Sequence, residues 1–109
     1  MIPPLSRIAV LNDVLRTTFF TGRVVFTEGV RAQGPEFESA TVEAVQSFKA
    51  FTPDNDPYGE HDFGAVTVMD RKVFWKIDYY APDMIHGSED PADPKQTVRV
   101  LTIMLAEEY

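Results

Sequence analysis

The stretch FGAVTVMDRKVFWKIDYY, residues 63–80, decides the fold of this chain of 109 residues. Apolar side chains alternate with polar or small ones through both of its halves, which is the two-residue period of a β-strand. Asp70 and Arg71 interrupt the alternation and mark a turn, although they are not a favoured pair for a tight hairpin. The stretch therefore predicts two antiparallel strands joined by a short turn.

The second half of this hairpin, VFWKIDYY (73–80), is the densest aromatic stretch of the chain. Alternation divides its side chains between two faces of the strand. The face expected in the core carries Trp75, Ile77 and Tyr79, and the opposite face carries Phe74, Lys76, Asp78 and Tyr80. Aromatic rings beside charges on an open face are typical of a recognition surface.

Two segments before the hairpin have the three- and four-residue spacing of amphipathic helices. The first is LSRIAVLNDVLRTTFF (5–20), and the second is GPEFESATVEAVQSFKAF (34–51), with Pro35 in its first turn. Between them, GRVVFTEGV (22–30) is β-branched and aromatic, which predicts a short strand that ends near Gly29.

The end of the chain, TVRVLTIMLAEEY (97–109), places Val98, Leu101, Met104 and Leu105 on one helical face. A helix is the simplest interpretation, although the β-branched start leaves a strand open. The expected order is helix, strand, helix, strand, strand, helix. It defines a single α+β domain, residues 1–109, in which about three helices cover a small, mainly antiparallel sheet of about three strands.

Composition excludes several classes of protein. Without cysteine, the chain has no disulfide framework, thiolate metal site or cysteine nucleophile. A formal net charge of −7 disfavours direct binding to nucleic acid, which needs clustered Lys and Arg. No apolar run approaches the length of a membrane helix, and the N-terminus lacks a signal-peptide pattern. We expect a soluble cytoplasmic protein with neither a membrane nor a nucleic-acid partner.

The acidic residues are concentrated in two segments that contain no Lys or Arg, here called the first acidic segment (52–62) and the second acidic segment (81–94). They hold eight of the 17 acids: Asp54, Asp56, Glu60, Asp62, Asp83, Glu89, Asp90 and Asp93. Such a concentration can bind cations, keep a protein in solution or dock on a basic protein surface. We expect the two segments to share one surface and to meet a basic protein partner.

The stretch DNDPYGEHDFG (54–64) gathers four carboxylates around one of the two histidines. His61 suits a general acid or base near neutral pH. Glu60 and Asp62 beside it are the other candidates for catalysis. A lone histidine in a loop is more often a hydrogen-bonding residue than a catalytic one.

A metal site in the same stretch receives weaker support. The candidate ligands are Asp56, Glu60, His61 and Asp62. The spacing resembles a calcium loop but lacks the bidentate glutamate at its last position, and a zinc site would also need His86 from the second acidic segment. No cofactor is expected.

The structural alternative is an ordered acidic loop. Asp54, Asn55 and Asp56 are residue types that form Asx-turns and caps. On the first helix, Asp13 lies three residues before Arg16, which predicts a local ion pair.

Six stretches together resemble a family of small proteobacterial proteins known only as a domain of unknown function and often encoded on plasmids, prophages and integrated elements. They are LNDVLR, GRVVFTEGV, FTPDNDPYGEHDFG, WKIDYY, DPADP and RVLTIMLAEEY, which together span nearly the whole chain. The resemblance implies one shared feature that contains Asn12, Asp13, Arg16, Asn55, Asp56, Glu60, His61, Asp62, Trp75, Lys76 and Asp78.

Two classes of function remain. The favoured one is a non-enzymatic binding protein, an accessory of mobile elements that inhibits or sequesters a host factor, as an anti-restriction or anti-CRISPR protein would. Its expected binding residues are Asp54, Asn55, Asp56, Glu60, Asp62, Trp75, Lys76, Asp78 and Arg16. The alternative is a small metal-dependent or acid/base hydrolase that uses residues 60–62.

Overall fold

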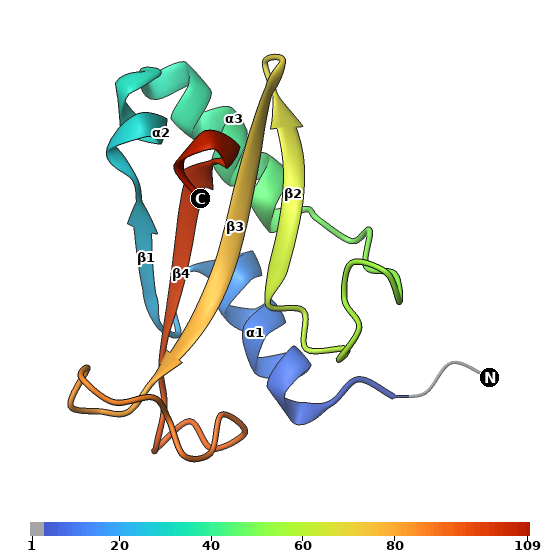
Figure 1. Cartoon of the computed structure of the whole chain (residues 1–109), viewed down its shortest axis with the longest axis vertical. Helices are drawn as coiled ribbons and strands as arrows, with labels where there is room; N and C mark the ends of the chain where they lie inside the picture. Colours follow the sequence, from blue (N-terminus) through green and yellow to red (C-terminus); the bar gives the residue numbers. More distant parts are fainter. Residues whose placement is uncertain (1–3) are drawn as a thin grey trace.

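A four-stranded mixed sheet forms the frame of the protein in the computed structural model, which describes residues 4–109. Strand β3 (Arg71–Tyr80) pairs antiparallel with β2 (Phe63–Val68) on one side and with β4 (Val98–Leu105) on the other. Strand β1 (Arg23–Phe26) runs parallel to β4 and completes the order β1-β4-β3-β2 (Figure 1). The two edges of the sheet are therefore β1 and β2.

The helices are α1 (Arg7–Thr18), α2 (Glu28–Ala32) and α3 (Pro35–Gln46). Both longer helices lie on the same face of the sheet (Figure 1). The hydroxyl of Ser6 caps α1 by accepting the N–H of Ala9, which satisfies one of the unpaired donors at a helix start. None of these helices within residues 4–109 is long and apolar enough to cross a bilayer.

The α+β class, the mainly antiparallel sheet and the first two predicted helices are confirmed, but the predicted C-terminal helix is wrong. Residues 98–105 form β4, and only Ala106–Glu108 coil, as the 3-10 turn η1. Alternate side chains of β4, from Arg99 to Leu105, are buried, so the two-residue period prevails over the helical one. The sheet therefore has four strands. The short helix α2, capped by Thr27, was not predicted and ends the first strand early.

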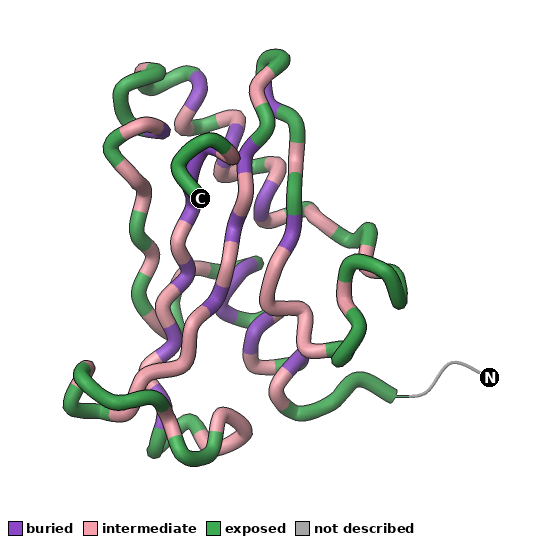
Figure 2. Tube along the Cα trace, viewed as in Figure 1, coloured by how far each residue is buried: buried purple, intermediate pink, exposed green. Residues whose placement is uncertain are grey.

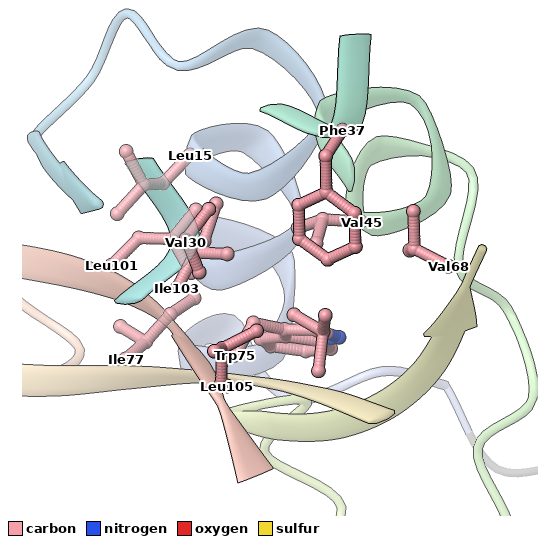
Figure 3. Packing of buried hydrophobic residues seen from close by; sticks show 11 residues of the cluster. Leu15, Val30, Phe37, Val45, Val68, Trp75, Ile77, Leu101, Ile103 and Leu105 are labelled. Carbon is pink, nitrogen blue, oxygen red and sulfur yellow. The ribbon is translucent and has the colours of Figure 1, made fainter. Parts of the chain in front are cut away.

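The core lies between the sheet and the helices (Figures 2 and 3). Trp75 is fully buried and Ile77 nearly so, as the alternation of the hairpin predicted, and Tyr79 packs against them. Gly64 on β2 faces the indole, because a Cβ at this position would stand 2.4 Å from Trp75 Nε1. A glycine is required there for the largest core side chain to fit.

The opposite face of the sheet has neither α1 nor α3 over it in Figure 1. Phe74 lies on this face, where its ring packs against Phe63 and against Tyr109 at the end of the chain, with centroids 5.2 and 5.6 Å away. The turn η1 lies in front of the same face (Figure 1). This end of the face is thus covered by aromatic rings, and the rest is open.

The hairpin turn is made by Met69 and Asp70, one residue earlier than predicted. Both have positive φ, 48° and 66°. Positive φ at both central residues is the type I′ geometry, which matches the right-handed twist of the two strands. Methionine adopts this backbone region rarely, so the turn is strained.

Replacing the turn by Asn-Gly, as Met69→Asn with Asp70→Gly, should relieve this strain. We expect the free energy of unfolding to rise by about 1 kcal/mol, because Asn and Gly adopt positive φ at low cost. Urea denaturation followed by Trp75 fluorescence measures the change. The control Met69→Leu keeps the strain and should leave stability unchanged; equal stability of all three proteins would contradict the assignment.

Candidate functional site

Helix α1 presents three polar side chains to the interior. Asn12, Asp13 and Arg16 are spaced so that they lie along one side of the helix. Asn12 is fully buried and Arg16 is 3% exposed. Each of the three contacts a segment far along the chain, so together they fix α1 to the rest of the fold.

The guanidinium of Arg16 lies against the end of α3. Its Nη1 donates to the main-chain oxygens of Val45 and Phe48, each at 3.0 Å, and Nη2 donates to Asp13 Oδ1 at 3.0 Å. The last carbonyls of a helix lack intrahelical partners, and α3 has no basic residue in its last turn. Arg16 therefore acts as the missing cap of α3, and the predicted ion pair with Asp13 is confirmed.

His61 is held between two carboxylates. Its Nδ1 lies 3.0 Å from both oxygens of Asp13, and its Nε2 lies 3.6 Å from Asp56 Oδ2. The ring stacks on Phe51, with centroids 3.7 Å apart and planes 4° apart. Because a carboxylate only accepts, Nδ1 carries a proton. His61 also has a positive φ of 56°, a strained backbone that these contacts maintain.

The first acidic segment is folded by its own side chains. Asp56 Oδ1 accepts the main-chain N–H groups of Glu60 and His61, at 3.1 and 3.2 Å. Asn55 Oδ1 accepts the N–H of Thr52, and its amide donates to Ala50 O. The structural alternative, turns and caps made by Asn55 and Asp56, is confirmed. Asp54 remains exposed and makes none of these bonds.

Asn12 is the centre of a second network, which joins both acidic segments. Its amide donates to Glu60 O and to Tyr79 Oη, at 2.9 and 2.8 Å, and its Oδ1 accepts from Arg99 Nε at 2.7 Å. Tyr79 in turn donates to Glu60 Oε1 at 2.9 Å. Arg99 also donates to Pro91 O, in the second acidic segment. The two segments are thus connected through two buried side chains.

Burial shapes the electrostatics of this network. It raises the pKa of the Tyr79 hydroxyl and lowers the pKa of the Arg99 guanidinium, since both charged forms lose hydration. Burial also raises the pKa of the Asp62 carboxyl, and the nearby charges of Glu60 and Asp56 add to this effect. The fold therefore disfavours the ionised form of Asp62.

The candidate residues of β3 divide between the two faces of the sheet. Lys76 and Asp78 form an ion pair at 3.0 Å on the open face, with side chains 36% and 41% exposed. The Asp78 carboxylate raises the pKa of Lys76 by hydrogen bonding to its ammonium. Trp75 points into the core. Of these three predicted binding residues, only Lys76 and Asp78 face solvent.

The proposed metal ligands are not brought together. Within residues 4–109, no group of three or more His, Asp or Glu side chains is placed to hold a metal ion. Glu60 is bonded to Tyr79, while Asp56 and His61 are used as described above. His86 is exposed in the second acidic segment and bonded to Asp83 at 2.7 Å.

The chemistry open to His61 is limited. Its ring and Asp56 line a hollow of about 450 Å³ beside the start of α1, together with Tyr58 and Ser6. An imidazole oriented by a carboxylate is suited to general-base catalysis. However, Nε2 faces Asp56, and no hydroxyl within residues 4–109 is hydrogen-bonded to it. Within residues 4–109 the site therefore has an oriented base without a hydroxyl bonded to it.

Sequence reasoning missed the buried Arg99, which joins Asn12 to the second acidic segment. Its only signal is an arginine at an inward position of an alternating strand, which is visible once TVRVLTIML is read with a two-residue period. No sequence pattern indicated that Phe51 stacks on His61. The resemblance did group Asn12 and Asp13 with the first acidic segment.

The fold and this network define a class: a small α+β protein whose acidic surface segments are fixed from inside by polar side chains of α1. A family model described as "Protein of unknown function (DUF3768)" matches residues 26–108, and the chain belongs to this family. The match begins after α1, so the NDVLR stretch lies outside it. No curated protein and no solved structure matches the chain.

Removing the amide of Asn12 should destabilise the whole protein. We expect Asn12→Ala to lower the free energy of unfolding by about 2–4 kcal/mol, because Arg99 and Tyr79 lose a buried partner. Urea denaturation measures the loss, and hydrogen exchange should accelerate in both acidic segments. The control Thr17→Ala, on the exposed side of α1, should cost under about 0.5 kcal/mol. Equal losses would contradict the role of Asn12.

Asp62→Asn should stabilise the protein at neutral pH. The folded-state pKa of Asp62 is raised, so its ionised form costs stability above that pKa, and the amide removes the cost. The gain should stay below about 1 kcal/mol, because the carboxyl is partly exposed. It should shrink as pH falls through the raised pKa and vanish below the ordinary value of 3.8. Melting curves from pH 3 to 7, with Asp54→Asn as the exposed control, test this; a gain independent of pH would contradict it.

Proposed function

We propose that the protein is a non-enzymatic binding protein whose acidic segments occupy a basic surface of another protein. The observation that carries this proposal is that the side chains suited to catalysis or metal binding are hydrogen-bonded to other groups of the same chain. His61, Asp56 and Glu60 are bonded within the fold, which supports a fixed binding surface over a reactive site.

The exposed side chains of the segments support the proposal. Asp54, Asp83, Glu89 and Asp90 are exposed, and no Lys or Arg lies within either segment. Tyr58, 87% exposed, supplies an aromatic ring beside these charges. Acidic and aromatic groups held in fixed positions are complementary to Lys and Arg on a partner. The Asn12 network gives both segments a common support.

The nature of the partner follows from charge and from the resemblance. We propose a host protein that handles nucleic acid, because its basic surface is built to hold closely spaced negative charges. The resemblance implies that such proteins occur in proteobacteria and are encoded on plasmids, prophages and integrated elements. An inhibitor of restriction or CRISPR nucleases, acting in the cytoplasm, fits both the charge and this setting. Binding would need neither direct nucleic-acid contact nor a cofactor.

The alternative, a small acid/base or metal-dependent hydrolase, has narrower support. Its one favourable observation is the Asp13–His61 pair, which resembles an oriented general base. The base faces a second carboxylate, and within residues 4–109 it has neither a hydroxyl bonded to it nor a metal-binding group beside it. A binding surface, in contrast to a hydrolase, requires neither a nucleophile nor a metal ion beside these residues.

Removing the exposed charges should weaken binding without unfolding the protein. The variant combines Asp54→Asn, Asp83→Asn and Glu89→Gln. Tagged protein is used to capture partners from a proteobacterial lysate, with quantification by mass spectrometry. We expect a nucleic-acid-handling protein that duplex DNA displaces and that the variant binds on the order of tenfold more weakly, since the exposed charges steer and hold the partner.

The control combines Glu28→Gln, Glu36→Gln and Glu43→Gln, which changes the net charge equally but on the helices. It should capture the same partner as the unmodified protein. If both variants lose the partner equally, total charge rather than the acidic segments is responsible, and if neither loses it, the proposed surface is wrong.

A further inference from the structure

Strand β2 presents an unpaired backbone edge. Ile77 N donates to Asp62 O at 2.8 Å, which fixes the phase of the β2–β3 ladder. Hydrogen-bonded and non-hydrogen-bonded pairs alternate in an antiparallel ladder. The N–H and C=O groups of Phe63, Ala65 and Thr67 therefore point away from β3. No other group within residues 4–109 is hydrogen-bonded to them.

This edge lacks the usual protection. Natural edge strands carry charges, prolines or bulges that prevent pairing with another chain. The sequence FGAVTV of β2 contains none of these residues, and Ala65 and Thr67 are exposed. The other edge, β1, has only four residues and begins with Arg23. An unprotected strand of six residues is a template on which an extended segment can pair.

The charges at the ends of β2 select the occupant. Asp62 precedes the strand and Asp70 follows it, in the turn. Two copies of this chain paired antiparallel along β2 would bring Asp62 of each copy close to Asp70 of the other, which is repulsive. A segment with Lys or Arg at both ends would place opposite charges there. Charge complementarity thus disfavours a second copy and favours a basic partner.

We infer that the free edge of β2 pairs with an extended segment of the partner protein, apolar or small at its centre and carrying Lys or Arg at its ends. The inference rests on the proposed binding function and specifies how the partner is bound. Main-chain hydrogen bonds from Phe63, Ala65 and Thr67 supply affinity that does not depend on side chains, and the flanking acids supply selectivity.

The test uses the full chain and the peptide acetyl-KTVTVTK-amide as probe. Amide hydrogen exchange and NMR chemical shifts locate the bound peptide. We expect protection of the outward amides of Phe63, Ala65 and Thr67. We also expect binding to weaken at least several-fold when the two Lys of the peptide are replaced by Glu.

The decisive variant is Ala65→Pro, with Ala65→Ser as its matched control. Proline removes one outward N–H, and it is tolerated at such an edge position because no bond to β3 is lost. Ala65→Pro should lose peptide binding while its melting temperature stays near that of Ala65→Ser. A peptide that binds both variants equally, contacts only the first acidic segment or does not bind at all would overturn the inference. A dimer that Ala65→Pro dissociates would also overturn it, because the edge would then serve a second copy.

The same variants separate this inference from the proposed function. One outcome is that the lysate partner is lost when the charges of Asp54, Asp83 and Glu89 are removed and yet is retained by Ala65→Pro. In that case the acidic segments bind the partner without pairing to the edge of β2. The inference then fails and the proposed function stands. If the unmodified chain captures no partner that depends on these acids, the proposed function itself fails.

Discussion

The buried guanidinium of Arg16 holds α1, the end of α3 and, through Asp13, the first acidic segment in their relative positions. A charge removed from water must be paired, and the Arg16 guanidinium is paired with Asp13 and hydrogen-bonded to the carbonyls that end α3. Its position fixes where α1 crosses α3. It also orients Asp13, which then binds His61 and so locates the first acidic segment. One cation thereby connects two helices and a surface loop.

The consequence is an internal support for an acidic surface. Carboxylates that crowd a short loop repel one another, and a flexible loop would separate them. Here Asp56 caps main-chain N–H groups and Glu60 accepts from Tyr79, so their charge is offset by donors within the fold. The remaining acids face solvent from a fixed backbone. The residue types of the first acidic segment are those of a catalytic site, but their hydrogen bonds are those of a structural scaffold.

Much of the fold was predictable because the apolar residues in most of its helices and strands follow either the helical period or the strand period, but not both. The hairpin and the two longer helices show one period each, and the structure places them close to the predicted bounds. The C-terminal segment satisfies both periods, since Val98 and Leu101 suit a helical stripe while Arg99, Leu101 and Ile103 suit alternation. Hydrogen bonding to β3 and β1 decided between them, and that pairing is not encoded in any local window.

Composition and spacings of a few residues are enough to specify the class of fold, the acidity of two surface segments and the local pair of Asp13 with Arg16. The role of His61, in contrast, depends on contacts made only in the folded chain. Its partner Asp13 lies 48 positions away, and a contact of that separation exists only once α1 packs beside the loop. The same holds for Asn12 and Arg99, which are 87 positions apart. Long-range contacts between buried polar groups thus hold the first acidic segment in one conformation.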